Sequence, residues 1–303
     1  MTHLPDAIGL RHTRFHSPAR LRIACLVPSI TETLFALGLG DRVVARTGFC
    51  IHPADGVREV PKVGGTKDVN VAKLIATEPT HVIVNIDENR KDTVDHLRRV
   101  IPNVVVTHPL VPEDNARLFA LLGHIFSADD AALALTRDLA AALADARNVG
   151  AMTAAEVVLY LIWKNPWMTV SRDTYVSAML ATVGWKTLPL QAERRYPEIA
   201  ADDTVWQTAE RILLSSEPYL FDESHVSALQ RDLQLTQPVA LIDGEMTSWY
   251  GVRAIAGLRY LADLRRNRDQ LSSQRLTARG QQPENSSGRQ SANHPLKPYT
   301  GGL

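Results

Sequence analysis

The residues of this chain best suited to hold a ligand are aromatic side chains in expected loops of its second half. They are Trp163, Trp167, Tyr196, Trp249 and Tyr250. Ligands of parallel-sheet proteins bind beyond the carboxyl ends of the strands, where these loops are expected to lie. Core packing explains any single one of them, since aromatic residues bury large areas. As a set, because of their loop positions, they predict a binding cleft.

Cys50 and His52 form a second candidate group, in the loop after the second expected strand. A thiolate and an imidazole are ligands for soft or borderline metal ions. Two such residues without further ligands at metal-site spacing do not define a site, so no metal centre is predicted. Cys25 is expected in a buried strand, where it acts as a small hydrophobe or forms a disulfide with Cys50.

Two acidic stretches admit two interpretations. Asp87 and Glu88 follow the strand expected to end at Asn85, and Asp202 and Asp203 open an expected helix in the second half. Carboxylates near a helix N-terminus complement the helix dipole, which is a sufficient structural reason for them. The functional alternative is a surface acid that docks a basic partner.

The first half of the chain alternates between short apolar runs and amphipathic segments. Expected strands cover 21–27, 43–46, 81–85 and 103–107, and expected helices cover 31–37, 71–77, 88–100 and 112–126. This alternation predicts a mostly parallel sheet that is covered by helices on both faces.

A long alanine- and leucine-rich helix is expected over 127–149, with Ser127 and Asp130 as a capping box and Gly150 at its end. A second alternation follows, with strands at 156–162, 212–215 and 239–242 and helices at 174–183, 204–209, 224–233 and 252–265. The fold class is therefore α/β, with two Rossmann-like lobes of parallel-rich sheet joined by a single long helix.

This organisation divides the chain into five parts. They are a flexible N-terminal segment 1–20, an N-terminal lobe 21–126, the linking helix 127–149, a C-terminal lobe 150–267 and a disordered tail 268–303 that is rich in Gln, Ser, Asn, Gly and Pro.

Composition excludes several function classes. The 303 residues carry a formal net charge of zero, which offers no electrostatic footprint for nucleic acid. No run reaches the ~18 apolar residues of a membrane span. Residues 1–19 lack the continuous apolar core of a secretory signal.

Several segments resemble one family, the substrate-binding proteins of iron-siderophore and vitamin B12 ABC transporters, also called helical-backbone metal receptors. The likeness runs from Arg22 to Leu264 and is carried by Pro28-Ser29-Ile30-Thr31-Glu32, Ala36-Leu37-Gly38, Val63-Gly64-Gly65, Leu74-Ile75-Ala76-Thr77-Glu78-Pro79 and Tyr196-Pro197-Glu198-Ile199. The resemblance implies two lobes joined by one rigid helix, in the class III arrangement, and an aromatic-lined cleft between them.

The resemblance also implies roles for single residues. Tyr196 falls at a cleft aromatic position, and Glu88 and Asp202 are the acids expected to engage the transporter permease. Cys50 or His52 would lie near the cleft and supply an axial ligand to a cobalt or iron centre. The implied compartment is the periplasm, with the cytoplasm as the alternative because no signal is visible.

We therefore expect a monomeric, non-enzymatic solute-binding protein without a covalently bound cofactor. It would capture cobalamin or a related corrinoid and deliver it to an ABC transporter permease. A ferric siderophore or haem is the alternative ligand. The competing class is an enzyme on the same scaffold, a metal chelatase or corrinoid-modifying protein, which would need a polar cluster in the cleft.

Overall fold

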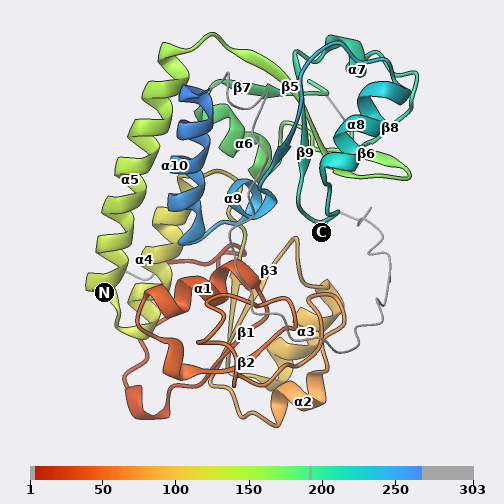
Figure 1. Ribbon diagram of the computed structural model, residues 1–303. Coiled ribbons are helices and arrows are strands. Elements are labelled where there is room, and N and C mark those ends of the chain that lie inside the picture. The colour runs from red at the N-terminus through yellow and green to blue at the C-terminus, as the bar shows by residue number, and fades with distance from the viewer. Residues whose placement is uncertain (1–3, 191–192, 268–303) are drawn as a thin grey trace.

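The computed structural model describes residues 4–190 and 193–267, and it consists of two lobes stacked on each other (Figure 1). The first lobe holds a four-stranded parallel sheet in the order β2-β1-β3-β4. Its strands are β1 (Ile23–Cys25), β2 (Val43–Arg46), β3 (His81–Asn85) and β4 (Asn103–Thr107).

Helices cover both faces of this first sheet, because its strands carry apolar side chains at consecutive central positions and so bury both faces. The helices are α1 (Pro28–Ala36), α2 (Val71–Ile75), α3 (Lys91–Val100) and α4 (Asp114–Phe126). Alternate strand residues contribute to two separate clusters: Val105 packs with side chains of α1 and α4, whereas Val104 packs with Leu74 of α2 and Leu97 of α3.

The second lobe is built on a six-stranded sheet in the order β10-β9-β5-β6-β8, with β7 also paired to β5. Its strands are β5 (Glu156–Trp163), β6 (Trp167–Thr169), β7 (Trp185–Thr187), β8 (Glu198–Ile199), β9 (Arg211–Ser215) and β10 (Val239–Ile242). Strands β5, β7, β9 and β10 pair in parallel, and β6 and β8 are antiparallel. The expected α/β class with two parallel-rich sheets is confirmed.

Helices again lie on both faces of the second sheet. They are α6 (Tyr175–Thr182), α7 (Val205–Thr208), α8 (Glu223–Asp232), α9 (Gly244–Ser248) and α10 (Arg253–Arg266). Trp206 of α7 and Leu229 of α8 pack with Leu214 on one face, while α6 and α10 pack on the other. Helix α9 follows β10 and lies where the two lobes meet (Figure 1).

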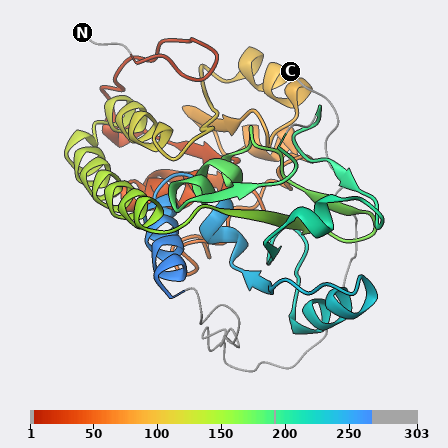
Figure 2. The same cartoon turned by 90° about the horizontal axis from the view of Figure 1, so that it is seen from above.

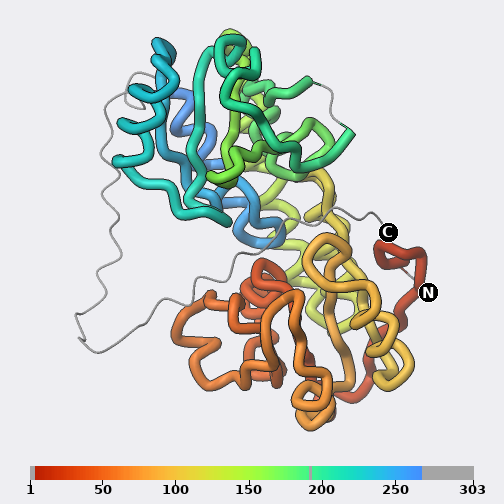
Figure 3. The backbone as a smooth tube through the Cα atoms, turned by 90° about the vertical axis from the view of Figure 1, so that its right-hand side faces the viewer, coloured from red at the N-terminus to blue at the C-terminus, as the bar shows by residue number. Residues whose placement is uncertain are grey.

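The long helix α5 (Asp129–Met152) runs beside both lobes, against α4 at one end and α10 at the other (Figures 1 and 2). Its 24 residues give a length of about 36 Å. The same arrangement is visible from the side, where the red and orange first lobe lies below the green and blue second lobe (Figure 3).

Both expected signals at the ends of α5 are wrong. Ser127 adopts a left-handed conformation with φ of 59° and ends α4, so it caps no helix start, and Ala128 precedes α5 without a side-chain cap. Gly150 lies inside α5, which continues to Met152. A Cβ at Gly150 would lie 2.6 Å from the carbonyl oxygen of Thr182, so the glycine permits close packing of α5 on the end of α6.

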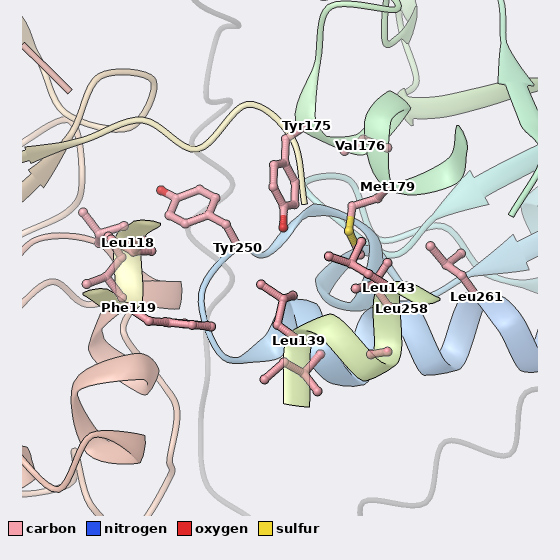
Figure 4. Close-up of a cluster of buried hydrophobic side chains, with 14 of the residues drawn as sticks. Leu118, Phe119, Leu139, Leu143, Tyr175, Val176, Met179, Tyr250, Leu258 and Leu261 are labelled. Carbon is pink, nitrogen blue, oxygen red and sulfur yellow. The ribbon is translucent and has the colours of Figure 1, made fainter. Parts of the chain in front are cut away.

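One hydrophobic cluster extends through both lobes. It joins Phe119 of α4 and Leu139 of α5 to Met179 of α6 and Leu258 of α10. Figure 4 shows these side chains with Tyr175 and Tyr250 between the lobes. The two lobes therefore share a core along α5.

Residues 4–20 are folded onto the first lobe, although the sequence suggested a flexible segment. The buried Asp6 carboxylate accepts hydrogen bonds from the backbone of Leu10 and Val106 and pairs with His12 at 3.1 Å. Phe15 bonds to Ile125 through its backbone N–H. The tail expected to be disordered, 268–303, lies outside the described residues.

Candidate ligand-binding site

The loops that follow strands of both sheets meet between the lobes. Segments after β1, β2 and β3 contact the segment after β10, which carries α9 and the start of α10. Strand ends that face each other in this way form the ligand-binding edge of α/β proteins. We call the facing surfaces the inter-lobe face.

Arg253 is the main ionic link across the inter-lobe face. Its guanidinium donates to Glu32 of α1 at 2.8 Å and 2.7 Å and also pairs with Glu245 of α9. The same group lies 4.9 Å from the ring centroid of Trp249. Because both carboxylates share one cation, Arg253 fixes α1 against the second lobe.

His52 forms a second link, in a loop that is held from inside the first lobe. The buried Arg46 donates to the carbonyl oxygens of Val57 and Cys50, each at 2.9 Å, and so fixes the loop that carries His52. The imidazole Nε2 lies 3.2 Å from Glu245, and its ring meets Trp249 edge-on at 5.6 Å.

Glu88 and Tyr250 form a third link. The Tyr250 hydroxyl donates to the carboxyl group of Glu88, and the Tyr250 ring packs edge-on against Tyr175 at 5.8 Å (Figure 4). Burial raises the pKa of Glu88 to about 7, against the opposing effects of the Tyr250 hydrogen bond and the nearby Lys67 charge. Glu88 is therefore a carboxyl group that changes charge near neutral pH.

Asp87 forms the fourth link, to the loop that carries Tyr196. Arg195 donates to its carboxylate at 2.7 Å, and His108 lies 3.2 Å from the other oxygen. Burial disfavours ionisation of Asp87, but these two partners outweigh it and hold its pKa below the usual value. The partly buried Tyr196 ring packs beside Arg195, 5.9 Å from its guanidinium carbon.

The predicted aromatic residues separate into two groups. Trp249, Tyr250 and Tyr196 belong to the links just described. Trp163 instead packs edge-on against Tyr219 at 5.5 Å, and Trp167 stacks on Phe221 in the core that contains Trp206. Trp167 is thus largely a packing residue of the second lobe, the alternative that the sequence had left open.

Cys50 does not fit the role of a ligand contact. Its side chain is fully buried, with Sγ 3.2 Å from Thr47 Oγ1 and directed into the first lobe toward the carbonyl of Cys25. Both cysteines are free thiols, so the alternative disulfide does not form. The neighbouring Phe49 is 50% exposed and was overlooked, although an apolar side chain at a loop tip is a recognisable signal.

The two acids expected to dock a permease have different surroundings. Asp202 is exposed just before α7. The carboxyl group of Glu88 is turned to the inter-lobe face and bonded to Tyr250, which argues against a role at the outer surface. Its position at the carboxyl end of β3 explains this, because Asn85 Oδ1 accepts from the Asp87 and Glu88 amides and folds the segment inward.

Sequence reasoning overlooked the charged residues that join the lobes. Arg253, Arg195 and Glu245 lie within a few residues of aromatic positions that were predicted, and this adjacency was the available signal. Glu217 lies far in the sequence from all of those aromatic positions, so no such signal marked it. Within residues 4–190 and 193–267, no three His, Cys, Asp or Glu side chains are grouped to hold a metal ion.

This chain belongs to the periplasmic binding protein family, whose model matches residues 23–224. In the described part of the chain, no helix has the length and apolar character needed to span a membrane. The two lobes, the single long helix and the facing strand ends are the class III arrangement of this family.

Individual relatives are distant in sequence. The vitamin B12-binding protein of Photorhabdus laumondii is 21% identical over 204 residues, covering 67% of this chain and 73% of that protein. An uncharacterised ABC transporter substrate-binding lipoprotein of Bacillus subtilis, YvrC, is 26% identical over 61% of this chain and 57% of its own length.

Solved structures of vitamin B12-binding and of haem-binding proteins share the fold. The periplasmic vitamin B12-binding protein BtuF of Vibrio cholerae has a TM-score of 0.71 at 18% identity, covering 81% of this chain and 96% of that chain. The periplasmic haem-binding protein RhuT of Roseiflexus has a TM-score of 0.69 at 19% identity, with 81% and 97% covered.

Proposed function

We propose that this protein is the substrate-binding component of an ABC transporter and captures cobalamin or a related corrinoid between its lobes. The observation that carries the proposal is the combination of Trp249, Tyr250 and Tyr196 with paired polar groups on the inter-lobe face. Flat aromatic surface favours a large planar ligand. The vitamin B12-binding relatives support the same ligand class.

Capture and release, without chemical conversion of the ligand, is the activity we propose. The relatives are binding proteins, which supports a non-enzymatic role. The relatives also support a periplasmic location and a transporter permease as the partner. We keep Asp202 as a docking acid, because its exposure suits contact with a basic surface, and we propose that the protein acts as a monomer.

Haem is the second candidate ligand. The fold likeness to a haem-binding protein is nearly as strong as the likeness to BtuF. His52 supports it, because an imidazole beside Trp249 at the inter-lobe face is an axial ligand for iron as well as for cobalt. A ferric siderophore, which is also a metal chelate, is the third candidate ligand.

A titration of the whole chain with cyanocobalamin tests the proposal, followed by tryptophan fluorescence and calorimetry. We expect saturable binding that weakens at least about tenfold in Trp249→Ala and in Tyr196→Ala. Trp167→Ala is the matched control, which should lower stability and leave the affinity of the folded protein unchanged.

The same titration with haemin separates the two candidates. Tight haemin binding without cobalamin binding would move the proposal to haem, and His52→Ala should then change the visible spectrum of the bound iron. Absence of binding to either chelate would overturn the proposal.

A further inference from the structure

Two carboxyl groups, one from each lobe, accept hydrogen bonds from the adjacent aromatic residues Tyr250 and Trp249. Glu88, after β3, accepts from the Tyr250 hydroxyl, and Glu217, after β9, accepts from the Trp249 indole N–H at 2.9 Å. Neither forms an ion pair within the residues that the structure describes. Among the described residues, each carboxyl group therefore has one neutral donor for its two oxygens.

The surroundings make these two acids costly to ionise. Burial raises the pKa of both, and the charge of Glu217 raises that of Glu88 further. Glu245 and Asp243 act in the same direction on Glu217. The hydrogen bonds from Tyr250 and Trp249 oppose these effects, as do the charges of Lys67 near Glu88 and Arg253 near Glu217. The position between Glu88 and Glu217 thus disfavours any additional negative charge.

The cations that line this part of the inter-lobe face are already engaged. Arg253 holds Glu32 and Glu245, Arg195 holds Asp87, and Lys67 donates to the Asp87 carbonyl at 2.7 Å. A ligand carboxylate would have to compete with these acids for a cation. A ligand N–H would meet acceptor oxygens that are still available on Glu88 and Glu217.

Ser29 supplies an independent sign of a missing partner. Its hydroxyl is 3% exposed at the first turn of α1 and has no hydrogen-bond partner among the described residues. It lies close to the Tyr250 hydroxyl and so to Glu88. Buried hydroxyl groups are nearly always hydrogen-bonded, so Ser29 retains hydrogen-bonding capacity for a polar group that approaches beside Tyr250.

We propose that Glu88, Glu217, Tyr250 and Ser29 form a selectivity site that accepts chelates with primary amide groups at their periphery and rejects chelates with carboxylates. A primary amide offers N–H groups to the Glu88 and Glu217 oxygens and a carbonyl oxygen to Ser29, which it reaches when the Tyr250 hydroxyl moves aside. A carboxylate offers no donor and meets like charge. This inference rests on the proposed function and deepens it.

The test compares two ligands that share one ring system. Cyanocobalamin and its monocarboxylic acid, in which one peripheral propionamide is hydrolysed, are titrated into the full chain at pH 8. We expect the amide form to bind at least about tenfold tighter, because like charges that face each other across an interface cost affinity. Glu88→Gln and Glu217→Gln should each narrow this ratio, and Asp202→Asn should leave it unchanged.

Measurements on the unchanged protein keep the test decisive if a variant folds poorly. In the unchanged protein the ratio of the two dissociation constants should shrink between pH 8 and pH 6, as Glu88 becomes protonated. Equal affinity of the unchanged protein for both corrinoids would overturn the selectivity site and leave the proposed function standing.

Failure of both corrinoids to bind would instead overturn the corrinoid proposal. The charge selection is then tested with haemin and its dimethyl ester. Tighter binding of the ester supports it, and equal or tighter binding of haemin overturns it.

Discussion

Arg253 at the start of α10 and Glu32 in α1 form a two-point ion pair across the lobes, with distances of 2.8 Å from Nε and 2.7 Å from Nη2. The side chains are only 11% and 21% exposed, so solvent screens the pair weakly. Two parallel hydrogen bonds between a guanidinium and a carboxylate set orientation as well as distance. The pair therefore aligns α1 with the second lobe.

Removal of Arg253 should destabilise the protein. Arg253→Ala leaves Glu32 and Glu245 without their shared cation, and we expect the free energy of unfolding to fall by about 2–4 kcal/mol. Arg253→Lys should retain part of this stability, since lysine keeps the positive charge but lacks the planar guanidinium group that bonds both oxygens of Glu32. Urea unfolding of both variants and of Glu32→Gln, arranged as a double-mutant cycle, measures the coupling. Strictly additive effects of the two sites would contradict the role of the pair.

The raised pKa of Glu88 predicts a pH-dependent stability. The folded protein holds a proton on Glu88 up to about pH 7, whereas the unfolded chain loses it near its ordinary value of 4.5. Between these values the folded state binds more protons, so the free energy of unfolding should fall as the pH rises, by about 3 kcal/mol in all.

The difference between the unchanged protein and Glu88→Gln isolates this effect from other titrating groups. Urea midpoints measured from pH 4.5 to pH 8 should converge at the acidic end and separate toward pH 8, where the variant should be the more stable. A difference that stays constant with pH would show that Glu88 has an ordinary pKa.

Gly251 should tolerate no side chain. Its φ of 76° is left-handed, and a Cβ there would collide with the Thr33 hydroxyl that receives the amide of Val252 at 3.0 Å. Gly38 has a similar φ of 74° with nothing within 4 Å, so it is a matched control for backbone strain alone. We expect Gly38→Ala to cost about 1 kcal/mol and Gly251→Ala at least twice as much. Thermal unfolding measures the loss of stability in both variants, and equal losses would contradict the close contact between Gly251 and Thr33.

The buried ion cluster of the second lobe should be sensitive to charge removal. Glu156 accepts from Trp185 Nε1 at 2.8 Å, from Arg211 at 3.0 Å and from Arg265 at 2.8 Å, and all three charged side chains are almost fully buried. Glu156→Gln leaves two buried guanidinium groups uncompensated, which should cost about 3–5 kcal/mol. The exposed Asp232→Asn should change stability by about 0.5 kcal/mol or less. A similar loss in both variants by urea unfolding would refute the prediction.

The two thiols should be inert in the folded protein. Burial raises the pKa of both Cys25 and Cys50, so little reactive thiolate forms. A thiol reagent such as dithionitrobenzoate should react with neither cysteine in buffer and with both in denaturant. Fast labelling of Cys50 in buffer would place it at the surface and reopen its role as a ligand contact.

Much of the fold was accessible from the sequence because its signals are local. Strands β2, β3, β4 and β10 have the expected bounds, since buried parallel strands are short apolar runs between polar turns. Strands β6 to β8 and helix α9 were not expected. They have two to five residues each, which is too short for a local period to mark them, and β7 and β8 also pair with strands that are distant in sequence.

The site was less accessible, because its geometry depends on residues that approach from both lobes. Loop position drew attention to Trp249, Tyr250 and Tyr196, which the structure places on the inter-lobe face. It could not separate them from Trp167, whose contact with Phe221 forms only when β6 pairs with β5. Nor could the sequence tell that Cys50 points into the first lobe, since that depends on how Arg46 anchors the loop.

The hydrophobic cluster that continues from α4 along α5 to α10 has a consequence for how the protein comes apart. Each lobe has a core of its own on one face of its sheet, but the other face is completed by this shared cluster, to which Leu139 and Leu143 of α5 belong. Separation of the lobes at α5 would expose that second face on each fragment. The two halves are therefore a single cooperative unit, and neither can be excised or exchanged as an independent module.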